Sequence, residues 1–119
     1  MTEKNKGFTR VYKAVQYSYK GFKACFKNEA AFRQELISAL VLIPLAMWLP
    51  VSKLERIVMV SSVVLVLIVE LLNSGIEAVV DRIGYEQHEL AGRAKDMGSA
   101  AVLISLMLWA YVWGSILFL

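Results

Sequence analysis

The chain has 119 residues, 58% of them hydrophobic, and carries a formal net charge of +3. A soluble domain has about 45–50% apolar residues, and one small domain cannot bury the excess against itself, so we expect much of the surface to face lipid. The single cysteine, Cys25, excludes an internal disulfide, and long apolar runs without alternating polar residues argue against a small β-barrel.

Residues 8–27 are predicted to form an amphipathic helix that lies in the membrane interface. Their large apolar side chains fall within about 60° on either side of one direction. These are Phe8, Val11, Tyr12, Val15, Tyr19, Phe22 and Phe26. Basic residues lie away from the centre of this face, as in helices whose lysines reach lipid head groups. Cys25 is expected to be a small packing residue, and the alternative for the whole segment is a soluble helix packed on a domain.

Three membrane-spanning helices are predicted over residues 30–49, 54–81 and 93–118, so that residues 1–119 form a single all-α membrane domain. The first has only 14 uncharged residues, 36–49, which give about 21 Å of helix against a hydrocarbon core of about 30 Å. Its extension back to Ala30 brings Arg33 and Glu35 to the membrane boundary, and Trp48 and Pro50 mark its far end. The third has 23 residues without a charge, 97–119, and is long enough to cross.

The basic residues predict the orientation of these spans. Eleven lie in the N-terminal region or around the second loop, and two lie in the first loop. The eleven are Lys4, Lys6, Arg10, Lys13, Lys20, Lys23, Lys27, Arg33, Arg82, Arg93 and Lys95, and the two are Lys53 and Arg56. Because cytoplasmic segments hold the excess of positive charge, the N-terminus and second loop should be cytoplasmic and the C-terminus should lie outside. This membrane pattern of charge also argues against a nucleic-acid partner, and no signal peptide is expected at the N-terminus.

The second span carries a stripe of polar residues at membrane depth. Helical rotation places them within about 60° of one direction. They are Glu70, Asn73, Ser74, Glu77 and Asp81. A carboxylate at this depth is costly unless it is paired, hydrated or protonated, so the stripe should face a protein interior or a wet cleft. A lone glutamate would fit a structural hydrogen-bond anchor, whereas this set favours a functional site.

Further polar groups are expected at the same cytoplasmic boundary as Glu77. Glu29 precedes the first span, and Lys95 and Asp96 open the third. Two simpler interpretations stay open. Arg33 could neutralise Glu29 as an i,i+4 pair, and the start of the third span could be a solvated, capped helix end.

The difference in depth predicts a division of labour. Glu70, seven residues from Glu77, should lie about 10 Å deeper. The shallow carboxylates suit Mg²⁺ and phosphates, and Lys95 suits the charge that develops in phosphoryl transfer. A deep glutamate suits a base for a hydroxyl group. Phosphoryl transfer to a lipid alcohol is therefore our hypothesis, although neither G-x-x-x-x-G-K-[ST] nor G-x-G-x-x-G occurs in the chain.

Three segments carry specific motifs: NEAAFRQE (28–35), VELLNSGIEAVVDRIG (69–84) and HELAGRAKDMGSAAV (88–102). Together they closely resemble the prokaryotic diacylglycerol kinase family, and the resemblance covers nearly the whole chain. The length and the N-terminal helix look like the diacylglycerol-using branch more than the undecaprenol-using branch. The resemblance implies a homotrimer with sites between protomers, in which the γ-phosphoryl group of MgATP is transferred to diacylglycerol to give phosphatidic acid. It also implies a bacterial inner membrane, so that the C-terminus would be periplasmic.

The resemblance also implies roles for individual residues. Glu70 matches the general base, Asn73 and Lys95 match the catalytic centre, and Glu29 and Glu77 match the metal-binding carboxylates. The residues implied at the nucleotide are Arg10, Tyr17, Glu29, Glu77, Glu86, Gln87, His88, Lys95 and Asp96. The residues implied at the lipid substrate are Arg10, Ala14, Ser18, Ala31, Arg33, Glu35, Trp48, Arg56, Glu70, Ser99 and Trp113. From its loop position alone, His88 would be a solvated side chain.

Three alternatives differ from the diacylglycerol kinase hypothesis. An undecaprenol kinase would keep the chemistry and change the acceptor. A small proton-coupled transporter would use an intramembrane glutamate to carry protons, although three spans and a strong charge bias fit it poorly. A membrane assembly factor would use the stripe to hold helices together, for which Ser or Asn would suffice.

Overall fold

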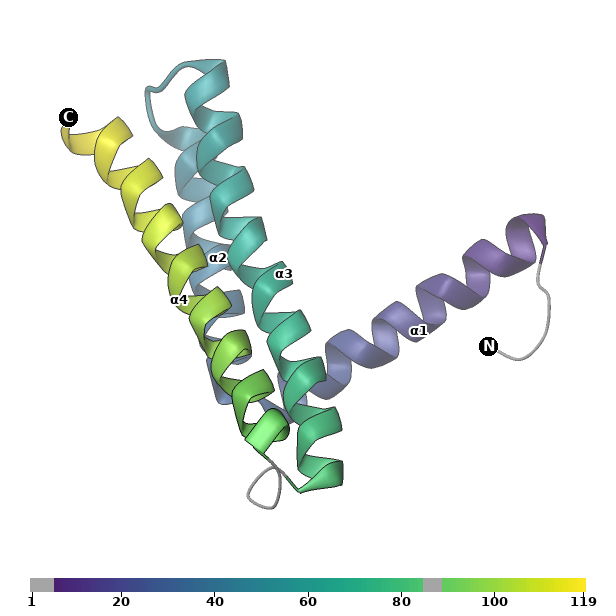
Figure 1. Ribbon diagram of the computed structural model, residues 1–119. Coiled ribbons are helices and arrows are strands. Elements are labelled where there is room, and N and C mark those ends of the chain that lie inside the picture. The colour runs from purple at the N-terminus through teal and green to yellow at the C-terminus, as the bar shows by residue number, and fades with distance from the viewer. Residues whose placement is uncertain (1–5, 85–88) are drawn as a thin grey trace.

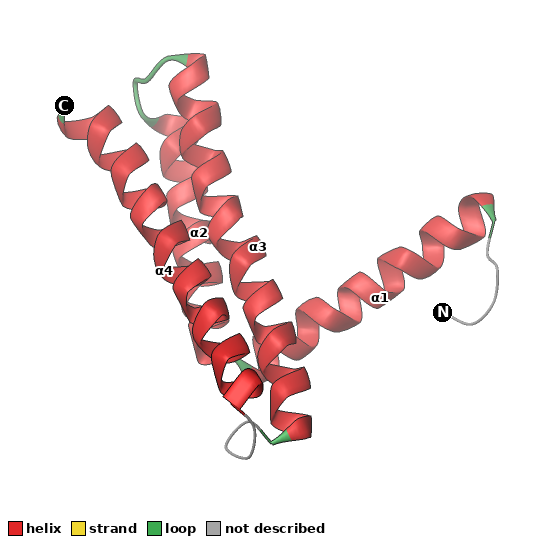
Figure 2. Cartoon of the chain, in the orientation of Figure 1, coloured by secondary structure: helices red, strands yellow, loops and turns green. Residues whose placement is uncertain are grey.

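The computed structural model describes residues 6–84 and 89–119, which form four α-helices (Figure 2). In chain order they are α1 (Gly7–Asn28), α2 (Ala30–Trp48), α3 (Lys53–Ile83) and α4 (Glu89–Phe118). Three of them, α2, α3 and α4, are long and apolar enough to cross a membrane. The prediction of an all-α chain with three spans is confirmed, and the protein is a multi-pass membrane protein.

The three spanning helices form an antiparallel bundle in which both α2 and α4 pack against α3 (Figure 1). α1 projects away from one end of this bundle, where it joins α2. Its C-terminal part contacts the bundle: the ring of Phe22 packs edge-on against Phe32 at 5.2 Å between centroids, and Cys25 is buried. The α2–α3 turn and the C-terminus lie at the opposite end.

Local signals set both ends of α3. The helix begins with a capping box, in which the Glu55 backbone N–H donates to Ser52 Oγ at 3.1 Å and the Ser52 N–H donates to the Glu55 carboxylate at 2.9 Å. It ends at Gly84, whose φ of 91° is left-handed. Glycine adopts this conformation without a Cβ clash, so it is a common helix terminator.

Two arginines cap the carbonyl ends of helices. Arg33 Nη1 donates to two carbonyl oxygens in the last turns of α1, at 2.8 and 3.0 Å. Arg56 donates to the carbonyl oxygens of Ala46 and Leu49, at 3.0 and 2.9 Å, where α2 ends. The last carbonyls of a helix have no partners within it and carry partial negative charge, which a guanidinium satisfies. These contacts fix the two turns that flank α2.

A small apolar core joins the three spans near the end of the bundle remote from α1. It contains Ala39, Ala46, Met59, Val63 and Trp113. The two alanines of α2 let α3 approach closely, and the indole N–H of Trp113 donates to the Met59 carbonyl oxygen at 3.1 Å. Many large apolar side chains of the spans stay exposed in the isolated chain, as expected where lipid or another protomer replaces water.

Candidate active site

The polar stripe of α3 runs from the bundle interior to its surface at the end where α1 joins. Glu70 is 5% exposed. Asn73, Ser74 and Glu77 are half-buried, and Asp81 is exposed. The side chains of the stripe therefore become more exposed toward the end of α3, and Glu70 is the most buried carboxylate.

Glu29 approaches this stripe from the break between α1 and α2. Its extended backbone, with φ −117° and ψ 108°, interrupts the helical path and separates the two helices. The Ser74 hydroxyl donates to Glu29 Oε1 at 3.4 Å, and the Cys25 thiol donates to Ser74 Oγ at 3.3 Å. The carboxyl groups of Glu29 and Glu77 lie close enough to share a hydrogen bond. Residues of α1, α3 and the break thus hold two carboxyl groups together.

Cys25 is the buried member of this set. Burial raises the pKa of its thiol above the ordinary value, and the nearby carboxylates act in the same direction. The prediction that Cys25 packs in the interior fits its 7% exposure. Its thiol is therefore a protonated hydrogen-bond donor to Ser74.

A cation from α4 lies beside the carboxyl pair. Lys95 Nζ is 3.0 Å from the Asp81 carboxylate. Its ammonium group is also close enough to the Glu77 carboxyl group for an electrostatic interaction. Asp96 and Ser99 are exposed on the same helix. A lysine held by one acid and facing a second is placed to contact an anionic ligand that binds between them.

Glu70 lies among other acids. The charged groups that act on it are Glu35 on α2, Glu77 on the same helix, and Glu29. We call these four residues the carboxylate cluster. Four carboxyl groups in so small a volume need positive charge from protons, from a metal ion or from a ligand that brings one.

The cluster fits a magnesium ion that is shared with phosphates. In the described part of the chain, no three acidic, His or Cys side chains are arranged to enclose a metal ion. Mg²⁺ is usually bound by one or two carboxylates, with water and substrate phosphates as its other ligands. The Glu29–Glu77 pair supplies that number of protein ligands.

Asn73 belongs to the stripe, and its side-chain oxygen is buried between α3 and α4. Its side-chain oxygen has no hydrogen-bond partner within the described residues. It lies against Gly98 of α4, so closely that a Cβ at position 98 would overlap it. The contact depends on glycine, because a larger residue would push the helices apart or displace the amide.

Several predicted residues are not brought together within one chain. On α1, Arg10, Ala14, Tyr17 and Ser18 are exposed, and the part of the helix that carries them extends away from the bundle (Figure 1). Arg33 donates to the carbonyl oxygens of Phe26 and Lys27, so its guanidinium caps α1 instead of pairing with Glu29. Ala31 is exposed in the first turn of α2.

The remaining predicted lipid-side residues lie at the other end of the bundle. Arg56 is fourteen positions from Glu70 on α3, which corresponds to about 21 Å. Trp113 contacts Met59 there, and Trp48, at the end of α2, is 80% exposed. Glu86, Gln87 and His88 lie outside the described residues.

Sequence reasoning missed three residues near the cluster, namely Ser38, Gly98 and Trp109. Ser38 is one turn beyond Glu35 and Trp109 is one turn before Trp113, so helical spacing from predicted residues offered a signal for both. For Gly98, the signal was a small residue within the polar start of α4.

Taken together, the fold and the cluster define a small helical membrane protein with an acidic site at one end of its bundle. Comparison with known proteins identifies one family. Residues 16–117 match the family model of prokaryotic diacylglycerol kinase. The chain is 57% identical over 113 residues to the diacylglycerol kinase of Escherichia coli K12, covering 95% of this chain and 93% of that protein.

Two further relatives agree. The diacylglycerol kinase of Haemophilus influenzae is 55% identical over 115 residues, covering 97% of this chain and 98% of that protein. That of Pseudomonas aeruginosa is 50% identical over 111 residues, covering 93% and 90%. The chain belongs to the prokaryotic diacylglycerol kinase family.

Proposed function

We propose that this protein transfers the γ-phosphoryl group of ATP to diacylglycerol, giving phosphatidic acid and ADP, at the carboxylate cluster. The observation that carries the proposal is the arrangement of its acids. Glu70 is enclosed, and the Glu29–Glu77 pair lies nearer the end of the bundle, beside Lys95. Seven residues of helix separate Glu70 from Glu77, or about 10 Å. A water-soluble nucleotide can approach the outer pair, and a lipid can approach the inner acid.

Each residue then has a defined role. The Glu70 carboxylate takes the proton of the lipid's primary hydroxyl as that oxygen forms its bond to the γ-phosphorus, and the bond from this phosphorus to the β,γ-bridging oxygen breaks to release ADP. Lys95 stabilises charge on the phosphoryl oxygens. Glu29 and Glu77 are the residues that would hold Mg²⁺, which when bound supplies positive charge to the phosphates of ATP. Asn73 and Asp96 border this centre from α3 and α4.

We also propose that the active unit is a homotrimer. Within one chain α1 reaches away from the bundle, so Arg10, Tyr17, Ala14 and Ser18 are far from that chain's own Glu70. A neighbouring protomer could receive them, which would bring the nucleotide contacts of α1 over the neighbour's cluster. The exposed aromatic face of α1, with Phe8 94% exposed, suits the membrane interface between such copies.

The excess of positive charge supports a cytoplasmic location for the cluster. Eleven basic residues lie on its side of the membrane pattern and two on the other, so this end of the bundle would face the cytoplasm and the nucleotide pool. Glu35, Ala31, Arg33 and Ser99 would contact the lipid's polar end. Trp48, Arg56 and Trp113 would lie along its acyl chains.

The first test is ATP turnover by purified protein in mixed micelles with diacylglycerol, with undecaprenol or with neither. We expect phosphatidic acid only with diacylglycerol and Mg²⁺. In Glu70→Gln we expect kcat to fall at least about 100-fold, because general-base catalysis contributes about 10²–10⁴-fold, while ATP binding persists. The control is Glu89→Gln, whose acid is exposed and pairs only loosely with Arg93 at 4.0 Å.

The outcomes separate the alternatives. Turnover with undecaprenol alone would keep the mechanism and change the acceptor. If folded protein phosphorylated neither lipid, the kinase proposal would fail. Proton transport that is lost in Glu70→Gln would then support a transporter. Unchanged kcat in Glu70→Gln would remove Glu70 from its role as the base.

The metal role has its own test. Glu77→Gln removes one of the two proposed ligands, so we expect the Mg²⁺ concentration for half-maximal activity to rise at least about tenfold, since each lost ligand weakens a site that has few. The KM for diacylglycerol should stay within about twofold, because the acceptor does not contact the pair. A rise in the lipid KM with an unchanged Mg²⁺ requirement would assign Glu77 to the lipid instead.

A further inference from the structure

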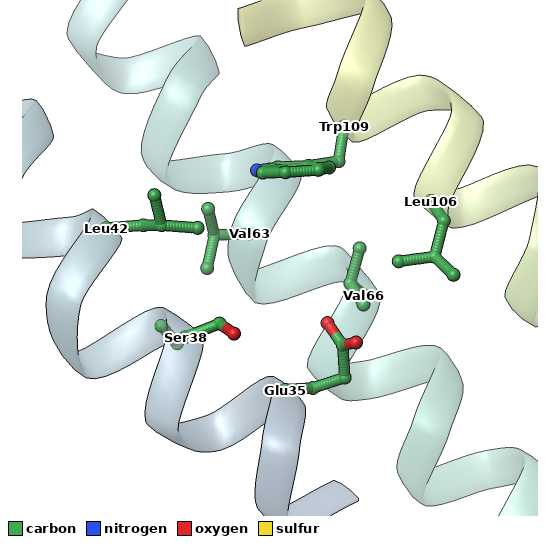
Figure 3. A pocket seen from close by; sticks show the side chains of 8 residues that line it. Glu35, Ser38, Leu42, Val63, Val66, Leu106 and Trp109 are labelled. Carbon is green, nitrogen blue, oxygen red and sulfur yellow. The ribbon is translucent and has the colours of Figure 1, made fainter. Parts of the chain in front are cut away.

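A cavity of about 120 Å³ opens between the three spans, directly beyond the carboxylate cluster. It lies over the face of α3 that carries Val63 and Val66, and α2 and α4 form its sides (Figure 3). Because one water-sized sphere takes about 10–15 Å³, this space holds a small polar group or several waters but no acyl chain.

Three polar groups line this otherwise apolar cavity. Glu35 and Ser38 enter it from α2, and Trp109 enters from α4 with its ring nitrogen directed toward α2 (Figure 3). The Trp109 Nε1–H is buried without a hydrogen-bond partner in the described parts of the chain. An indole N–H can only donate, so whatever satisfies it has to be an acceptor.

The cavity extends away from Glu70 into the membrane. Glu35 borders it and also acts electrostatically on Glu70. Val66 and Val63 precede Glu70 on α3 by four and seven positions, so they lie about 6 and 10 Å deeper than Glu70. The axial order is therefore the proposed base first, then Glu35, and finally the Trp109 donor.

Diacylglycerol presents its polar atoms in the same order. Its free hydroxyl is the outermost group, the ester carbonyls follow a few ångströms deeper, and the acyl chains continue toward the bilayer centre. With the hydroxyl at Glu70, an ester carbonyl reaches the depth of the cavity. A carbonyl oxygen is an acceptor without a proton, which is the complement of an indole N–H.

We infer that this cavity is a subsite for an ester carbonyl of the acceptor lipid, to which Trp109 Nε1–H donates a hydrogen bond. The Ser38 hydroxyl lies at the same cavity and can donate to the same oxygen. The contact makes Trp109 a specificity-determining residue, because an alcohol without a carbonyl leaves its N–H unsatisfied. The inference rests on the proposed function, since it places the lipid hydroxyl at Glu70.

The test compares two acceptors that differ only in the carbonyls. These are a diacylglycerol and the dialkyl ether analogue of equal chain length, each measured as kcat/KM in mixed micelles. Trp109→Phe removes the N–H and keeps an aromatic ring. We expect it to lower kcat/KM for the diacylglycerol about five- to tenfold, the worth of one hydrogen bond, and to change the value for the ether by less than about twofold.

Tyr111→Phe is the matched control. Like Trp109→Phe, it removes one hydrogen-bond donor, here a hydroxyl group, from an aromatic residue of α4. Tyr111, however, is 72% exposed and lies outside the cavity. We expect it to leave both acceptors unchanged. Should Trp109→Phe fail to fold, Ser38→Ala tests the same oxygen, with a smaller loss confined to the diacylglycerol.

An equal effect of Trp109→Phe on both acceptors, or no effect on either, would overturn the inference and assign the cavity to water. This failure differs from a failure of the proposed function. If the inference alone is wrong, the unmodified protein still phosphorylates diacylglycerol, but Trp109 does not determine its preference for an ester over an ether. If the proposed function is wrong, the unmodified protein phosphorylates neither the diacylglycerol nor the ether.

Discussion

Gly98 is the point at which α4 has no room for one more carbon atom against α3. A Cβ built there overlaps Asn73 Oδ1, and it lies 3.2 Å from Asn73 Cγ and 3.8 Å from Ile76 Cδ1. Gly98→Ala therefore forces the Asn73 amide to move or the two helices to separate. Because Asn73 borders the carboxylate cluster, both stability and kcat should fall.

The magnitude follows from two opposed effects. Overpacking a close interface costs about 1–3 kcal/mol, whereas replacing glycine by alanine inside a helix contributes about 0.5–1 kcal/mol of stability. We expect a net loss of about 1–2 kcal/mol in the free energy of unfolding, measured by denaturant titration of the protein in mixed micelles.

The control and the double variant make this reasoning refutable. Gly114 lies on the same helix with no other atom within 4 Å of its built Cβ, so Gly114→Ala should be neutral or slightly stabilising. Asn73→Ala removes the overlapped atoms, so adding it to Gly98→Ala should restore about 1–2 kcal/mol. The explanation is wrong if Gly98→Ala is as stable as Gly114→Ala, or if removal of the Asn73 amide brings no recovery.

Three further predictions concern contacts outside the cluster. Arg56→Met should lower the free energy of unfolding by about 2–3 kcal/mol, because it leaves the carbonyl oxygens of Ala46 and Leu49 without their charged donor. A loss below about 0.5 kcal/mol would show that water replaces the guanidinium. Trp113→Phe should cost about 1 kcal/mol by the same measurement, the worth of its single buried hydrogen bond, and a neutral result would contradict that role. Burial raises the pKa of the Cys25 thiol, so at pH 8 iodoacetamide should alkylate it more slowly in the folded than in the denatured protein; equal rates would show that it is accessible.

The spans and the polar stripe could be predicted because they depend on local periodicity. Any helix that carries Glu70 and Glu77 places them on one side, whatever surrounds it, and the cost of charge in lipid turns that side inward. Ser52 and Glu55 also have the spacing of a capping box, which is a local signal for the start of α3.

The direction of α1 and the partners of the arginines could not be predicted in this way. Spacing allowed Arg33 to pair with Glu29, but the backbone turns at Glu29 and brings the carbonyl end of α1 within reach of the guanidinium instead. Trp109 was also hidden, because an aromatic residue in an apolar span is expected to pack on lipid or core. Its role depends on the alignment of α4 with α2 across α3, which no local pattern specifies.

These arginine contacts have a consequence for the cluster. Arg33 donates to the carbonyl end of α1, and Arg56 caps α2 at the other end of the bundle, so neither guanidinium pairs with the acids of the cluster. In the part of the chain that the structure describes, the cation that acts on Glu77 is Lys95, which also pairs with Asp81. Among the described residues the carboxyl groups of the cluster thus outnumber the cations that act on them, and protons or a metal–nucleotide complex would balance the difference. If Glu29 and Glu77 hold Mg²⁺ as proposed, two protein ligands would bind it weakly until ATP supplied the remaining ligands, so Mg²⁺ affinity and ATP affinity should rise together.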